Sequence, residues 1–111
     1  MPLLSLLALL SVGQAMAQPL PFEGRWAMKL EWCVAKDGQP PPIRLTAKRL
    51  DAIVMTCDFT SVLPGGVSHR VEADCVAGKD RGREFFGFAK LDDRLYWNWG
   101  SRTEGYVRCP D

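Results

Sequence analysis

Apolar and polar residues alternate along most of the chain after residue 25. The clearest run has one apolar face, made by Val67, His69, Val71, Ala73 and Cys75, and one polar face, made by Ser68, Arg70, Glu72 and Asp74. Successive side chains of a β-strand point to opposite sides of a sheet, so this pattern predicts a strand with one buried and one solvated face. Further strands are predicted over residues 25–34, 43–46, 53–60, 83–91, 95–99 and 106–109, with a loop over Gly100–Gly105. Residues 45–54 are the one candidate for a short helical turn.

Turn residues separate these runs, and one hairpin predicts a disulfide. Asp37-Gly38 and Pro40–Pro42 end the first strand, and Pro64-Gly65-Gly66 joins the third and fourth. A turn centred near Gly65-Gly66 would place Cys57 nearly opposite Cys75, on the apolar face of both strands. The four cysteines allow three connectivities. We favour Cys57–Cys75 with Cys33–Cys109, which would tie the first strand to the last.

The register of the aromatic hairpin over residues 83–99 stays open. A three-residue turn at 92–94 would leave Phe86 and Phe88 facing outward, whereas a two-residue turn would pair Phe88 with Trp97 and bury both. A slip of one residue exchanges the two faces of a strand.

The strand count predicts an all-β fold, a small antiparallel barrel or sandwich of about six to eight short strands. A link between the first and last strands favours closure, because closure removes exposed edges. The length of the chain predicts a single domain over residues 18–111.

Residues 1–17 predict a cleavable signal peptide. Leu3 to Val12 is an apolar run that is too short to span a bilayer, and Ala15-Met16-Ala17 has the small residues of a cleavage site. No Lys or Arg precedes the apolar run, which departs from the usual signal pattern. We expect cleavage after Ala17, a periplasmic or secreted mature protein, and no membrane span in the mature chain.

Charge and cysteine spacing argue against several classes. A formal net charge of +1 gives no field to attract nucleic acid. Structural zinc sites usually contain a close pair of cysteines, and none is present here. An even number of cysteines in an exported chain instead predicts disulfides. No metal or cofactor is predicted, and the oligomeric state is left open.

Scattered residues carry a resemblance. Gly24-x-Trp26, four spaced cysteines, Pro42-Ile43, Leu45-Thr46 and a closing Arg108-Cys109-Pro110 resemble a group of small exported proteins of Gram-negative bacteria. That group has no established activity, so the resemblance implies only a periplasmic or secreted setting. The size and the early G-x-W are also loosely similar to periplasmic protease-inhibitor and lysozyme-inhibitor barrels, without an inhibitory loop signature.

Catalytic candidates are few. His69 is the only histidine, and it lies on an apolar strand face, where a core role is expected. Glu72 and Asp74 share a strand face with Ser68 and Arg70, which is the pattern of a solvated face rather than of an acid–base pair. We therefore do not expect an enzyme.

Aromatic residues supply the candidate binding surface. The four tryptophans (Trp26, Trp32, Trp97 and Trp99) are expected to fill the core, or else to line a barrel mouth that holds an apolar ligand. The favoured function is a non-enzymatic envelope or secreted binding module, with inhibition of an exported enzyme as one form of it. Its candidate surface comprises Phe86, Phe88, Tyr96, Trp97 and Trp99. The alternatives are a barrel that binds a small apolar ligand and an enzyme that uses His69.

Overall fold

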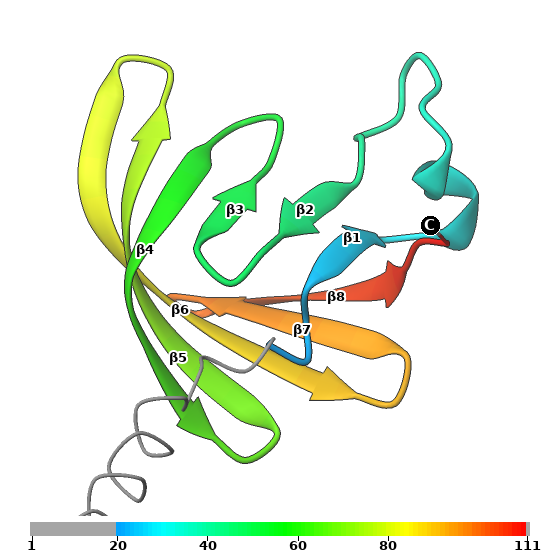
Figure 1. The fold of residues 1–111 in the computed structure, drawn as a ribbon. Coiled ribbons are helices and arrows are strands. Elements are labelled where there is room, and N and C mark those ends of the chain that lie inside the picture. Colours follow the sequence, from blue (N-terminus) through cyan, green and yellow to red (C-terminus); the bar gives the residue numbers. More distant parts are fainter. Residues whose placement is uncertain (1–19, 111) are drawn as a thin grey trace, which may run out of the picture.

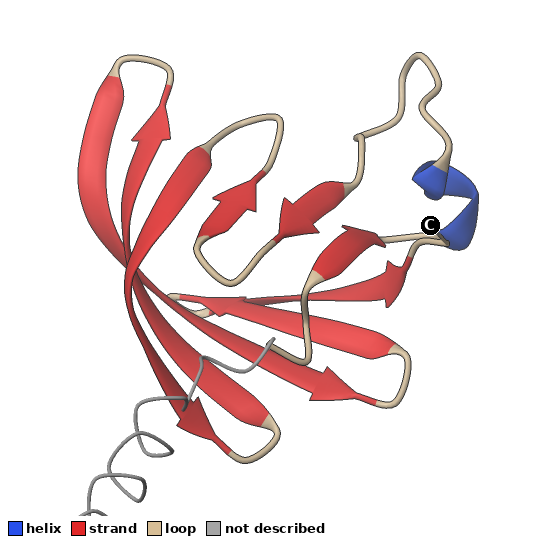
Figure 2. Ribbon diagram, viewed as in Figure 1, coloured by secondary structure: helices blue, strands red, loops and turns tan. Residues whose placement is uncertain are grey.

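The computed structural model describes residues 20–110, which form a closed antiparallel barrel of eight strands in chain order (Figure 1). The strands are β1 (Gly24–Ala27), β2 (Ile43–Leu45), β3 (Arg49–Asp51), β4 (Thr56–Gly65), β5 (Ser68–Ala77), β6 (Asp80–Leu91), β7 (Arg94–Trp99) and β8 (Arg102–Arg108). One 3₁₀ turn, η1 (Leu30–Cys33), is the single helical element of the described part (Figure 2). The predicted all-β barrel is confirmed, and the expected signal peptide lies outside the described residues.

Both predicted disulfides are present. Cys33 is bonded to Cys109, with their Cα atoms 5.4 Å apart, and Cys57 is bonded to Cys75, with their Cα atoms 4.0 Å apart. Cys57 and Cys75 are direct partners in the β4–β5 ladder.

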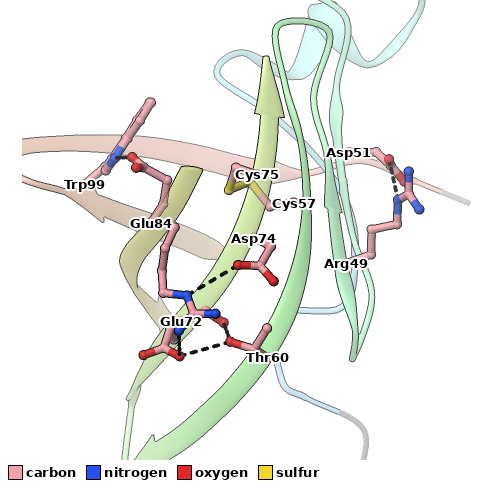
Figure 3. Close-up of a disulfide and its surroundings, with 10 residues drawn as sticks. Arg49, Asp51, Cys57, Thr60, Glu72, Asp74, Cys75, Glu84 and Trp99 are labelled. Carbon is pink, nitrogen blue, oxygen red and sulfur yellow. Dashed lines mark hydrogen bonds and ion pairs between the residues drawn. A yellow bond between two sulfur atoms is a disulfide. The ribbon is translucent and has the colours of Figure 1, made fainter. Parts of the chain in front are cut away.

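A β-bulge sets this pairing. The ladder next to the turn pairs Gly65 with Ser68, and that register would carry Cys57 opposite Val76. Thr60 is an extra residue between Phe59 and Ser61, and it shifts the register by one so that Cys57 meets Cys75. The Thr60 hydroxyl donates a hydrogen bond to the backbone oxygen of Glu72 at 3.1 Å (Figure 3).

The first strand is shorter than its alternation predicts. β1 ends at Ala27, and Met28, Leu30 and Val34 are exposed. The prediction of a strand to residue 34 is therefore wrong. The β1–β8 ladder pairs Ala27 with Val107, so a continued β1 would carry Cys33 opposite Ser101. The chain instead turns back through η1, which brings Cys33 to Cys109.

Residues 45–54 are a hairpin, so the expectation of a helical turn is also wrong. Leu45 pairs with Leu50, and both side chains are buried. Ile53 and Val54, which were predicted in a strand, lie in the loop between β3 and β4 and are exposed. Strand pairing with neighbours overrides the local helical pattern here.

The aromatic hairpin adopts the two-residue turn. Asp92 takes a positive φ of 55°, Phe88 pairs with Trp97, and Phe86 pairs with Trp99. Phe86 and Phe88 are buried. Phe22, just before β1, is fully buried and closes the barrel end that carries the β4–β5 and β6–β7 turns. The centroid of its ring lies 5.1 Å from that of Phe88 and 5.3 Å from that of His69.

One cluster gives a physical reason for Gly24, Trp26 and Arg108. The Arg108 guanidinium lies 4.3 Å from the ring centre of Trp26 and donates hydrogen bonds to the backbone oxygens of Glu23 and Pro21. A side chain at Gly24 would meet the same guanidinium. The first and last strands are therefore joined by a cation–π contact as well as by a short ladder.

Candidate functional site

Unequal strand lengths leave a pocket at the other end of the barrel. β1, β2 and β3 have three or four residues, whereas β7 and β8 have six and seven. β8 continues to Arg102 beyond the end of β1, so the barrel wall is low on the side of β1–β3. An open pocket of about 260 Å³, which we call the mouth pocket, lies there. It is lined by Ala27, Met28, Trp32, Pro40, Pro41, Ile43, Ala52–Met55, Trp97, Trp99, Arg102, Glu104 and Tyr106.

Aromatic rings form much of this lining. Trp97 and Trp99 are stacked nearly parallel, with centroids 5.9 Å apart and planes at 5°. Trp97 and Tyr106 are buried, and Trp32 reaches the pocket from η1 half-buried. Trp97 and Trp99, which belong to the predicted binding surface, line this pocket, and Trp32 joins them from a segment that was predicted as a strand.

The two indole N–H groups of this stack differ in their partners. Trp99 Nε1 donates to Glu84 Oε1 at 3.0 Å (Figure 3). Trp97 Nε1 is buried and has no acceptor among the described residues. A buried donor without a partner costs about 1–3 kcal/mol, so this position is unusual.

Charged side chains share the inner face of β8. Arg102, Glu104 and Tyr106 alternate along β8 and pair with Trp99, Trp97 and Leu95 respectively. Burial, with the Glu104 carboxylate adding to it, raises the pKa of Tyr106 to about 12, and Arg102 acts in the opposite direction. Neither Arg102 nor Glu104 takes part in an ion pair within residues 20–110. Gly100–Gly105 was predicted to be a loop, and this prediction is wrong because β8 begins at Arg102. Arg102 and Glu104 were therefore not predicted as site residues, although their spacing with Tyr106 is that of a strand.

Aliphatic side chains surround the opening. Ile53 is 76% exposed, Val54 is 70% exposed and Met28 is 41% exposed. The alternation of apolar and polar residues could not identify these three residues as the rim of the pocket, because Ile53 and Val54 lie in the loop that joins β3 to β4.

The other predicted surface residues lie elsewhere. Phe86 and Phe88 belong to the core rather than to an exposed surface, because the two-residue turn directs them inward. Tyr96 lies half-buried, with its ring 3.5 Å from the position that a side chain at Gly105 would take. The predicted set is thus divided between the core, the pocket and the outer wall.

His69 is buried on β5 against Phe22, and its Nδ1 atom has no partner in the described part. It does not line the mouth pocket. Glu72 and Asp74 lie on the outer wall, 3.5 and 3.3 Å from Arg83. Within residues 20–110, no group of three or more His, Cys, Asp or Glu side chains is placed to hold a metal ion.

No helix within residues 20–110 has the length and apolarity needed to cross a membrane. No protein-family model, curated protein or solved structure matches the chain.

Proposed function

We propose that this protein is an exported, non-enzymatic binding protein that holds a small apolar molecule in the mouth pocket. The observation that carries this proposal is the open pocket beside Trp97 and Trp99. An eight-stranded barrel is filled by its own side chains or holds one small ligand. Here Trp26, Phe88 and Leu95 are fully buried inside the barrel, and the pocket lies at its open end.

The two disulfides support the exported setting, since disulfides form and persist in oxidising compartments. We expect the mature protein to begin at Gln18. Intact mass spectrometry of protein recovered from the periplasm or medium of expressing cells checks this. A chain that remains in the cytoplasm and retains Met1 would contradict it.

The chemistry at the pocket supports binding rather than catalysis. His69 lies in the core, and Glu72 and Asp74 are paired with Arg83 on the outer wall. The ionisable groups that line the pocket are Arg102, Glu104 and Tyr106, and no histidine or free cysteine stands beside them to act as a base or nucleophile.

A neutral fluorescent probe tests the proposal. We expect N-phenyl-1-naphthylamine to bind the oxidised protein with enhanced probe emission and with energy transfer from tryptophan. Ile53→Asp should weaken probe binding about tenfold, because it places a carboxylate against the apolar probe at the opening of the pocket.

Val67→Asp is the matched control. Val67 is 60% exposed in the turn between β4 and β5, away from the pocket lining, and its substitution should leave affinity unchanged. Equal effects of the two variants, or no probe binding, would refute the proposal.

A second candidate is a protein-binding module, which includes an inhibitor of an exported enzyme. The observation that favours it is the exposure of Met28, Ile53 and Val54 around the opening, since exposed apolar groups mark interaction surfaces. This candidate would be favoured if the protein captures one exported protein and does not bind the probe. The capture should be abolished by Ile53→Asp and kept by Val67→Asp.

A further inference from the structure

The mouth pocket combines aromatic walls with one carboxylate. Trp32, Trp97, Trp99 and Tyr106 line it together with Glu104. The faces of aromatic rings carry negative electrostatic potential, and clusters of such faces are used to recognise ammonium groups that carry methyl substituents.

Glu104 has no cation of its own. It is half-buried, pairs with Trp97 across the β7–β8 ladder, and makes no ion pair within the described residues. Removing a carboxylate from water is costly unless a positive charge compensates it. A cationic ligand would supply that charge.

Two cations of the chain oppose or compete with such a ligand. Arg102 lies exposed at the same lining, and Lys29 Nζ lies 5.0 Å from the ring centre of Trp32. At the Tyr106 hydroxyl, however, the effect of Glu104 on the pKa exceeds the effect of Arg102. Glu104 is also half-buried, whereas Arg102 is exposed, so water screens the charge of Arg102 more strongly.

The apolar lining selects among cations. The side chains of Ile43, Ala52 and Met55 offer no hydrogen-bond acceptor, so a metal ion or a primary ammonium group would lose more hydration than the single carboxylate of Glu104 restores. An ammonium group shielded by methyl groups sheds water at lower cost and contacts both the aliphatic and the aromatic walls.

We propose that the mouth pocket binds a small organic cation whose ammonium group is methylated, with the cation held by the aromatic side chains that line the pocket and by the Glu104 carboxylate. This inference rests on the proposed function and names the chemical class of its ligand.

Choline and its neutral isostere 3,3-dimethylbutan-1-ol test the inference, because they share shape and differ in charge. Titrations are followed by NMR through the indole N–H signals. We expect choline to shift the signals of Trp97 and Trp99 and to bind about tenfold more tightly than the isostere. The indole N–H of Trp26 donates a hydrogen bond of 2.7 Å to the backbone oxygen of Phe22, and Trp26 does not line the pocket. Its signal is therefore the internal control.

Charge variants separate a local contact from the overall field. Glu104→Gln should weaken choline binding about tenfold and leave the isostere unchanged, whereas Arg102→Gln should strengthen choline binding. Glu72→Gln removes the same charge from the outer wall and should have no effect. Vesicles of phosphatidylcholine present the same cation on a lipid. If the protein floats with the vesicles and Glu104→Gln abolishes this, the ligand is a membrane lipid; if the protein does not float, the ligand is a free molecule.

Equal affinities for choline and the isostere, or equal effects of Glu104→Gln and Glu72→Gln, would overturn the inference. If N-phenyl-1-naphthylamine still binds, the apolar pocket stands and only the cation is excluded. If neither the neutral probe nor choline binds, the proposed function fails as well.

Discussion

Tyr106 reports the electrostatics of the pocket at the scale of one residue. Its phenol is buried and lies on the inner face of β8 with Glu104 and Arg102. Burial disfavours the charged phenolate, and the neighbouring carboxylate disfavours it further, so the pKa of Tyr106 rises to about 12. The folded state therefore prefers the neutral form.

This preference gives a titration with a definite sign. In Tyr96→Phe, Tyr106 is the only tyrosine, and we expect its ultraviolet absorbance to titrate near pH 12 when folded, against about pH 10 in denaturant. Because the folded pKa is the higher one, the contribution to stability is full below about pH 10 and is lost as the pH rises through 12.

Adding Glu104→Gln should lower the folded midpoint, because it removes the neighbouring negative charge. Rapid pH jumps limit damage to the disulfides. A folded midpoint near that of the denatured chain would show that Tyr106 is solvated and that the pocket is not as described.

Single residues also set the limit of what alternation predicts. The inward side chains of β5 from His69 to Cys75 were predicted correctly, because alternation is a local property of an extended chain. Phe86 and Phe88 were left undecided, since their direction depends on whether Asp92 adopts a positive φ and closes a two-residue turn.

The segment between β1 and β2 is the element that builds one wall of the pocket. It supplies Met28, Trp32 and Pro40–Pro41, and it contains no strand. It is held by the Cys33–Cys109 disulfide and by a hydrogen bond of 2.8 Å from the Arg25 guanidinium to the backbone oxygen of Cys33. The other disulfide lies inside the β4–β5 ladder and touches a different part of the fold.

We therefore expect the two disulfides to separate binding from stability. Cys33→Ala/Cys109→Ala should weaken probe binding at least about tenfold, because the wall loses its tether. Cys57→Ala/Cys75→Ala should keep affinity while the protein is folded. In the loop-entropy model both pairs lower the free energy of unfolding, by about 4 and about 3 kcal/mol respectively.

Probe titration and denaturant unfolding of both variants give the two quantities. Unchanged affinity in folded Cys33→Ala/Cys109→Ala would mean that the wall is held by its packing alone.

The whole molecule is a barrel with one end closed and one end open. Phe22 packs against Phe88 and His69 at the closed end, and the low wall of β1–β3 leaves the other end open. Phe22 precedes β1 and belongs to no strand, yet it is fully buried.

Phe22→Ala should lower the free energy of unfolding by about 3–5 kcal/mol, because it leaves a cavity at the closed end. Phe85→Ala is the control: its ring is 64% exposed, and a change within about 0.5 kcal/mol is expected. Denaturant unfolding measures both. A similar small loss in the two variants would contradict the role of Phe22 as a plug.

Local pattern alone determined the strand class and the inward face of β5, because alternation acts over a few residues. It placed Cys57 near Cys75, but the bulge at Thr60 decided their pairing, and the bond between Cys33 and Cys109 joins segments 76 residues apart. The tertiary structure decided where β1 ends, because a strand continued along β8 would place Cys33 opposite Ser101, whereas Cys33 is bonded to Cys109. It also decided the pocket, which exists because residues 27–55 and 97–106 meet at one end of the barrel on strands of unequal length. A cavity of that kind depends on contacts between distant segments, and no periodicity within one segment encodes it.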